Sequence, residues 1–121
     1  METELFSKVK QLLQGHKLVM SDEKQLQAQI MGILGAAPGF PFFIREYTLT
    51  GAGIIDFLIT GGVGIEVKIK GSPMAIHRQL KRYAKHSEVN EIILVTSKTM
   101  TLPEFIEGKP ANFIQLSKSW L

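Results

Sequence analysis

The middle of the chain holds three segments that favour β-structure and are separated by very short turns. Rich in β-branched and aromatic residues, these segments are 42–49, 53–59 and 63–69. Gly51 lies in the first turn, and Gly61 and Gly62 form the second. Turns this short can join only antiparallel neighbours, so the sequence predicts a three-stranded antiparallel meander.

Helical patterns precede and follow this meander. Apolar residues recur at helical spacing in three stretches: 2–14, a stretch that begins near Ser21 or Asp22 and runs to about 34, and 73 to about 87. Ser72 and Pro73 suit the cap and the first turn of the third helix. The apolar segment 91–96 then predicts a fourth strand, buried on both faces and parallel to an earlier one, and 112–116 a short edge strand. We expect an α/β fold of the α+β type, with a mixed sheet of about four strands flanked by helices.

Length and composition predict one domain and exclude disulfides, thiolate metal sites and membrane-spanning helices. The chain has 121 residues without repeats or a linker, which predicts one domain spanning 1–121. It contains no cysteine, which excludes disulfides and thiolate metal sites. No apolar run is long enough to cross a bilayer or to form a signal-peptide core, so we expect a cytoplasmic protein without a membrane partner. The formal net charge of +3 suits a polyanionic partner.

Three charged residues interrupt the second and third apolar strands. Asp56 lies in the second predicted strand, 53–59. Glu66 and Lys68 lie two residues apart in the third, 63–69, and so share a face. Across the hairpin, Asp56 can approach Glu66. Two carboxylates suit a hard cation, and a neighbouring lysine can orient water or stabilise negative charge. The alternative is a solvated strand face in which Lys68 is only an ion-pair partner of the acids.

This order of residues resembles the PD-(D/E)XK nuclease superfamily, over roughly residues 42–96. The family pattern is an aspartate after a short apolar stretch, followed by D/E-x-K on the next strand, and Ile55 replaces the proline that often precedes the aspartate. The resemblance implies a restriction-endonuclease-like core with Asp56, Glu66 and Lys68 as catalytic residues. It also implies that Asp56, Glu66 and the backbone carbonyl of Val67 bind Mg²⁺, with Mn²⁺ as a substitute.

A second motif lies on the predicted helix after the strands. Gln79 and Tyr83 are one turn apart and resemble the Q-x-x-x-Y motif of RecB-type nucleases, which implies a role in holding substrate or the active-site lysine. Core packing is the alternative for Tyr83. Basic residues accompany the motif, and we expect them to contact phosphates unless they form only a solvated face. They are Arg78, Lys81, Arg82, Lys85 and, just after the strand motif, Lys70.

The resemblance implies a third acid whose position is less clear. Members of the superfamily often supply it from an N-terminal helix or from the first strand. The helix position that matches best holds Gln27, with Glu23 one turn earlier. Glu46 in the first strand is the other candidate and is preferred slightly over Glu23, which also suits the first turn of a helix as an acid favoured by the helix dipole.

The expected function is therefore a metal-dependent nuclease that hydrolyses phosphodiester bonds. Size and motif order are similar to those of virus-type replication-repair nucleases and Holliday-junction resolvases, which implies structure-selective DNA cleavage in replication, repair or recombination. RNA stays open as a substrate, and a homodimer or a larger nucleic-acid-processing complex is the expected assembly. The alternative is a non-catalytic nucleic-acid-binding protein, or a structural subunit of a phage or defence complex, with the same fold.

Overall fold

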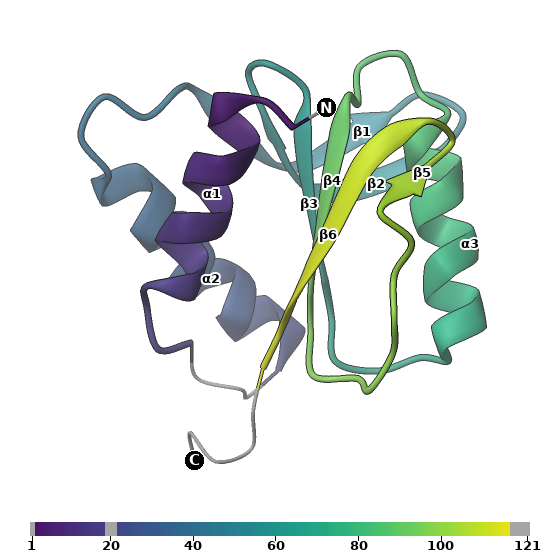
Figure 1. Cartoon of the computed structure of the whole chain (residues 1–121). Helices are drawn as coiled ribbons and strands as arrows, with labels where there is room; N and C mark the ends of the chain where they lie inside the picture. Colours follow the sequence, from purple (N-terminus) through teal and green to yellow (C-terminus); the bar gives the residue numbers. More distant parts are fainter. Residues whose placement is uncertain (1, 19–21, 117–121) are drawn as a thin grey trace.

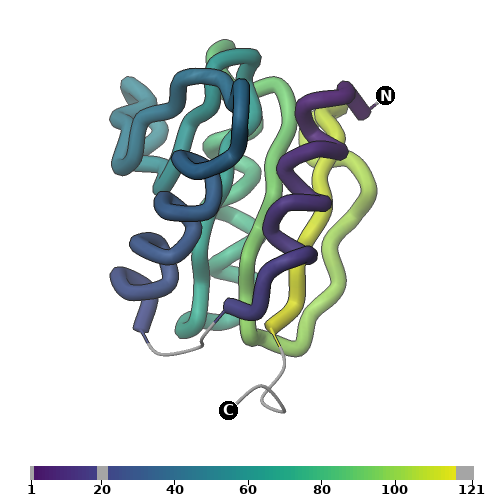
Figure 2. The backbone as a smooth tube through the Cα atoms, turned by 90° about the vertical axis from the view of Figure 1, so that its left-hand side faces the viewer, coloured from purple at the N-terminus to yellow at the C-terminus, as the bar shows by residue number. Residues whose placement is uncertain are grey.

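A computed structural model describes residues 2–18 and 22–116. In this part of the chain, a mixed sheet separates α1 and α2 on one face from α3 on the other (Figure 1; Figure 2). The elements in chain order are α1 (Glu4–Gln14), α2 (Glu23–Ala36), β1 (Phe43–Leu49), β2 (Gly53–Ile59), β3 (Val63–Lys68), α3 (Pro73–Ala84), β4 (Glu91–Thr96), β5 (Phe105–Ile106) and β6 (Lys109–Gln115). No helix in the described ranges is long and apolar enough to cross a membrane.

The sheet confirms the predicted meander and extends it. β1, β2 and β3 are antiparallel neighbours, and β4 pairs in parallel with β3 and is buried along its whole length. The described residues form six strands in the order β1-β2-β3-β4-β6-β5, against about four expected. The segment 112–116, expected as a short edge strand, contributes most of its residues to β6, which pairs in parallel with β4. The start of β6 is hidden in the sequence because Lys109 and Pro110 are poor strand formers.

Side-chain caps begin α2 and α3, as the sequence predicts. The Asp22 carboxylate accepts a hydrogen bond from the Gln25 N–H at the start of α2, whereas Ser21 lies outside the described residues. The Ser72 hydroxyl caps α3 in the same way. α3 ends at Ala84 and not near residue 87, because the next turn is tighter: the His86 N–H bonds the Tyr83 carbonyl three residues back.

The two faces of the sheet carry separate cores. Against α1 and α2 the core contains Phe6, Leu26, Ile30, Phe57 and Ile65, all fully buried. Against α3 it contains Leu49, Ile76, Leu80, Tyr83 and Leu94. Each face therefore has its own set of apolar contacts, and the sheet is held from both sides.

In the β1–β2 hairpin, side chains exchange faces part-way along the strands. Phe57 packs toward α1 and α2, but Ile55, two residues earlier, packs toward α3. In a regular strand residues two apart share a face. The change falls at Asp56, and the residue opposite it, Glu46, has φ 56°, a left-handed conformation uncommon for a residue other than glycine.

This change of face brings the hairpin tip onto α3. The Tyr83 hydroxyl donates a hydrogen bond to the Ile54 carbonyl at 2.7 Å. Gly53, at φ 115°, lies against the Tyr83 ring, where a Cβ would be 3.6 Å from Cε1. α3 therefore holds the tip of the hairpin, and β2 bends at Asp56.

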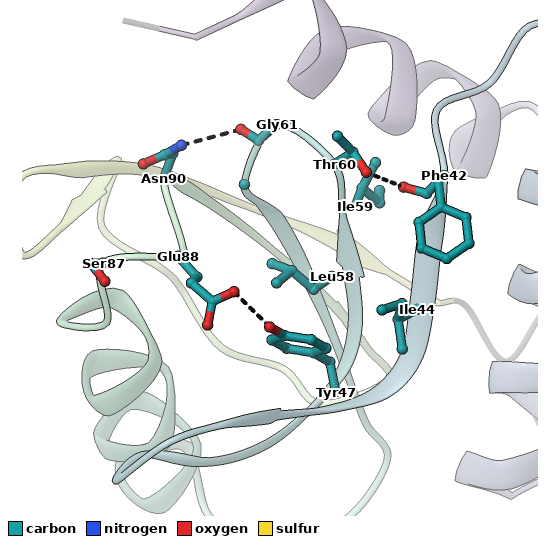
Figure 3. Close-up of a pocket in the computed structure, with 11 residues that line it drawn as sticks. Phe42, Ile44, Tyr47, Leu58, Ile59, Thr60, Gly61, Ser87, Glu88 and Asn90 are labelled. Atoms are coloured by element: carbon teal, nitrogen blue, oxygen red, sulfur yellow. Dashed lines mark hydrogen bonds between the residues drawn. The ribbon is translucent and has the colours of Figure 1, made fainter.

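A cavity of about 450 Å³ lies between the start of β1 and the loop after α3 (Figure 3). Across it, the Tyr47 hydroxyl donates a hydrogen bond to Glu88 at 2.6 Å, and the Asn90 amide donates to the Gly61 carbonyl at 3.2 Å. These contacts connect β1 and the β2–β3 turn to the loop after α3. None of the residues predicted to act in a nuclease site lines this cavity.

Candidate active site

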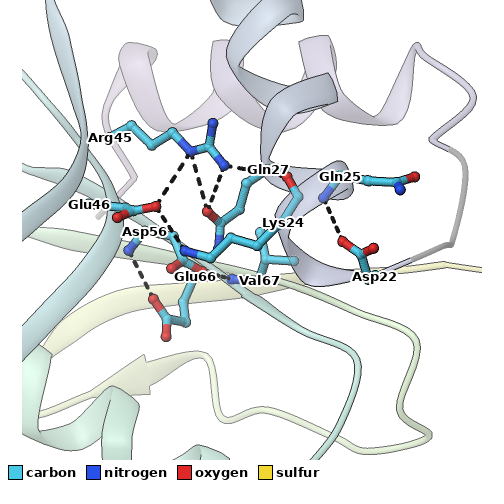
Figure 4. Close-up of polar contacts among 9 residues, drawn as sticks. All are labelled: Asp22, Lys24, Gln25, Gln27, Arg45, Glu46, Asp56, Glu66 and Val67. Carbon is cyan, nitrogen blue, oxygen red and sulfur yellow. Dashed lines mark hydrogen bonds and ion pairs between the residues drawn. The ribbon is translucent and has the colours of Figure 1, made fainter.

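Asp56 and Glu66 meet where β2 and β3 separate (Figure 4). The regular backbone pairing of these strands ends at Phe57 and Ile65. Beyond that point the Glu66 Oε1 atom accepts a hydrogen bond from the Asp56 N–H at 3.0 Å, and the Asp56 Oδ2 atom accepts one from the Val67 N–H at 2.8 Å. The two carboxylates thus replace backbone carbonyls as acceptors between the strands, and the proximity predicted from the sequence is present.

Glu66 of this carboxylate pair is buried and Asp56 is partly buried, so the surroundings are unfavourable for two negative charges. Glu66 is 2% exposed. Burial and the nearby charge of Asp56 raise the pKa of Glu66 to about 8. Burial also raises the pKa of Asp56, against the opposing effect of its hydrogen bond from Val67. At neutral pH the pair therefore retains a proton, which a bound cation could replace.

Lys68 stands beside this pair. It follows Glu66 by two residues in β3 and shares its face, and its Nζ atom lies 3.7 Å from Glu66 Oε2. The side chain is 23% exposed and borders a cavity of about 560 Å³, together with Asp22, Glu23 and the segment 69–71. The lysine thus connects the buried acids to an open surface.

The two candidates for a third acid lie in different surroundings. The Glu23 Oε2 atom accepts hydrogen bonds from the N–H groups of Ile69 at 2.9 Å and Lys70 at 3.4 Å, and the charge of Glu23 helps to raise the pKa of Asp56. Glu46 instead forms an ion pair with Lys24 at 2.8 Å. The charge of Glu23 therefore acts on the acidic pair, whereas the charge of Glu46 is compensated by a cation. In residues 2–18 and 22–116, no three acidic or histidine side chains converge on one metal position.

Gln27 holds the position on α2 where the sequence comparison looked for a third acid, and its side chain binds an arginine of β1. Its side chain is 3% exposed, and its Oε1 atom accepts hydrogen bonds from Arg45 Nε at 3.3 Å and Nη2 at 3.2 Å. Arg45 Nη2 also donates to the Lys24 carbonyl at 3.3 Å. The sequence analysis did not identify Arg45 or Lys24, because no local pattern indicates that the first turn of α2 lies against β1.

Gln79 and Tyr83 form one connected pair, as their spacing predicts. Gln79 Nε2 donates to the Tyr83 hydroxyl at 2.8 Å, and that hydroxyl donates to the Ile54 carbonyl. Tyr83 is 1% exposed, and burial, followed by the charge of Glu66, raises its pKa. The position of Tyr83 in the core fits the packing alternative, and its hydroxyl also secures the bend of β2 next to Asp56.

The predicted basic residues of α3 are all exposed. Arg82 and Lys85 border a cavity of about 260 Å³ at the tip of the β1–β2 hairpin, together with His86. Lys85 also lies 3.7 Å from Glu107. Lys70 belongs to a different surface, because it lines the cavity next to Lys68.

The raised pKa of Glu66 predicts how stability depends on pH. When the pKa of an acid is higher in the folded than in the unfolded chain, its protonated form stabilises the fold at pH values below the unfolded-state pKa. This contribution is lost as the pH rises through the folded-state pKa. The melting temperature in chelator should fall by about 5 °C or more between pH 4.5 and about 8, measured by circular dichroism. Glu66→Gln should flatten this fall. A parental profile that is flat over this range, or one that Glu66→Gln leaves unchanged, would contradict the described electrostatics.

No protein-family model matches the chain, and no curated protein or solved structure is significantly similar to it. Its function must therefore be argued from the chemistry of Asp56, Glu66, Lys68 and their surroundings.

Proposed function

We propose that the chain is a metal-dependent nuclease that hydrolyses phosphodiester bonds, with a restriction-endonuclease-like core of the PD-(D/E)XK type. The observation that carries this proposal is the pair of the partly buried Asp56 and the buried Glu66, which lie together where β2 and β3 separate and whose pKa values are both raised. Burying two carboxylates side by side destabilises the fold unless a proton or a cation compensates their charge. Such an arrangement is typical of functional sites.

The residues present suit a hard divalent cation. Asp56 and Glu66 each use one oxygen on a backbone N–H, and their other oxygens, Asp56 Oδ1 and Glu66 Oε2, are the proposed metal donors, the second of them 3.7 Å from Lys68 Nζ. The backbone carbonyl of Val67 is the third proposed donor, and Glu23 is the better of the two candidate acids, because its charge acts on Asp56 whereas Glu46 is paired with Lys24. All are oxygen donors, the kind that Mg²⁺ and Mn²⁺ prefer. When bound, the cation would supply charge neutralisation at the phosphate and a more acidic water.

Lys68 is the proposed catalytic cation of the chain itself. Its ammonium group lies beside Glu66 and borders an open cavity, so it can contact a phosphate or a water molecule that enters there. It would stabilise the negative charge that develops on the phosphorane oxygens, or orient the attacking water. The rigid strand β3 fixes its starting position relative to both acids.

DNA is the proposed substrate, cut according to its structure during replication, repair or recombination. The exposed basic residues of α3 and Lys70 favour a polyanion. The two helical layers and the sheet leave little room for a module that reads base sequence in a groove. Selection by the shape of the nucleic acid is therefore the better match, in a homodimer or in a larger nucleic-acid-processing complex.

A specific observation favours a second candidate, a non-catalytic nucleic-acid-binding or structural subunit. Asp56 and Glu66 already accept backbone hydrogen bonds, and the described residues place no third acid at the same point. In this alternative the carboxylates only pin the separated strands together. The nuclease proposal predicts chemistry that such a role does not require.

The first test of this proposal is cleavage by variants of the three central residues. Lys68→Ala should lower the single-turnover rate of DNA cleavage by about a hundredfold or more, or about 3 kcal/mol, because a transition-state contact is lost. Asp56→Asn should abolish cleavage that depends on Mg²⁺ or Mn²⁺, since an amide is a poorer, uncharged ligand. Excess chelator should have the same effect on the parent protein.

Binding and folding serve as controls for this test. DNA affinity and the melting temperature should be retained in both variants, which would separate chemistry from folding. Linear, flapped, single-stranded and four-way DNA should all be assayed. Parental cleavage rates in folded Lys68→Ala or Asp56→Asn protein would place the active site elsewhere, and no cleavage of any substrate by the parent would favour the non-catalytic alternative.

The basic face of α3 gives a second prediction. If its four cations contact phosphates, replacing them with glutamine should weaken DNA binding and reduce the log–log salt slope by about one for each lost contact. The residues are Arg78, Lys81, Arg82 and Lys85. Fluorescence anisotropy across a salt series measures the slope, with Lys8→Gln on α1 as the control for a general loss of charge. An unchanged slope after all four replacements would place this face away from the nucleic acid.

A further inference from the structure

A group of charged residues, Lys24, Arg45 and Glu46, lies next to Asp56 on the side of α2. The pairs Arg45 with Phe57 and Tyr47 with Ile55 define the register of β1 and β2, so Glu46 stands opposite Asp56. Opposed residues on neighbouring strands have Cα atoms about 5 Å apart. Whatever binds at Glu46 is therefore close to the proposed metal site.

Glu46 holds two cations at this position (Figure 4). Its Oε1 atom lies 2.8 Å from Lys24 Nζ and 4.0 Å from Arg45 Nε. The hydrogen bond and charge of Lys24 lower the pKa of Glu46, so the carboxylate is ionised at neutral pH. Two cations and one carboxylate leave the group with a net positive charge.

The backbone of Glu46 is strained in the conformation that places it here. Its φ is 56°. This conformation is unfavourable in free energy for any residue that has a side chain, whereas glycine adopts it readily. Strained residues of this kind cluster at ligand sites. Here the strained residue directs a carboxylate at two cations within one strand spacing of Asp56.

Arg45 is fixed more firmly than an ordinary surface arginine. Its Nε and Nη2 atoms donate to the buried Gln27 oxygen, and Nη2 also donates to the Lys24 carbonyl. These bonds leave the Nη1 amino group outside this network. Because the guanidinium is already ordered, less side-chain entropy is lost when it binds an anion.

We propose that Lys24 and Arg45 bind a phosphodiester of the nucleic acid that neighbours the phosphodiester to be cleaved. In the free protein, the Glu46 carboxylate occupies this site. The proposal rests on the proposed nuclease function. It explains why a residue with a side chain adopts a left-handed conformation opposite Asp56, and why the family's acidic position carries Gln27, which orients Arg45 through its oxygen. A phosphate oxygen would replace the carboxylate oxygen of Glu46 as the partner of both cations.

The test compares two exposed variants that change the charge in opposite directions. Glu46→Gln removes the competing carboxylate, and Lys24→Gln removes a cation whose side chain is 71% exposed. The probe is a short fluorescein-labelled DNA, single-stranded and duplex, and affinity is measured by anisotropy in chelator over a salt series. Glu46→Gln should bind about three- to tenfold more tightly at low salt, and Lys24→Gln as much more weakly, with a salt slope lower by about one.

The Glu2–Lys10 pair supplies matched controls. It is another ion pair, with Lys10 Nζ 3.1 Å from Glu2 Oε1, and it belongs to the segment around α1. Glu2→Gln and Lys10→Gln therefore make the same changes in net charge away from the proposed site. Both should leave affinity within about twofold of the parent, which separates a local phosphate site from a general effect of charge.

The outcomes distinguish this proposal from the nuclease function. Changes at Glu46 and Lys24 that match those of the controls, or no DNA binding by any of the proteins, would overturn the phosphate site, even if cleavage depends on Asp56. The expected opposite changes in affinity would support the phosphate site. If those changes occur while the parent cleaves nothing in Mg²⁺ or Mn²⁺, the phosphate site stands and the nuclease function does not.

Discussion

The exchange of hydrogen bonds between Asp56 and Glu66 across β2 and β3 is the interaction on which the rest of the site depends. Each carboxylate accepts an N–H from the other strand, Asp56 from Val67 and Glu66 from Asp56 itself. This exchange satisfies the backbone where the regular ladder ends, so β2 can bend away without leaving buried N–H groups unpaired. The same exchange places the buried Glu66 beside the partly buried Asp56.

The bend also explains how residues far apart in sequence surround the acids. Tyr83 on α3 holds the tip of the hairpin through the Ile54 carbonyl, and Glu23 at the start of α2 accepts the N–H of Ile69 after β3. Both helices begin or pack near the gap that the bend opens. The cavity beside Lys68 is accordingly lined by the start of α2 and by the segment that follows β3.

The sequence predicted those parts of the fold that have local signals. The meander follows from the glycine turns, and the parallel β4 follows from a buried apolar run after a helix. The bend of the β1–β2 hairpin, where Glu46 stands opposite Asp56, has no such local signal, because it depends on contact with α3. The first three residues of β6 were missed because Lys109 begins the strand, and there its ammonium group donates to the carbonyls of His86 and Val89, a use of lysine that only the tertiary structure shows.

The candidate site divides in the same way. Asp56, Glu66 and Lys68 could be identified because each interrupts an apolar strand, and the structure brings them together. The choice between Glu23 and Glu46 could not be made from spacing alone. It depends on which strand the first turn of α2 faces, and therefore on packing between helix and sheet.

Calorimetric titration with Mn²⁺ tests most directly whether the Asp56–Glu66 carboxylate pair binds a divalent cation. The parent should bind one ion per chain near neutral pH and release about one proton, seen as a dependence of the heat on buffer ionisation, because Glu66 is protonated before the ion binds. Glu66→Gln should lose both the binding and the proton release. Absence of binding by the parent, or an unchanged isotherm in Glu66→Gln, would contradict the account.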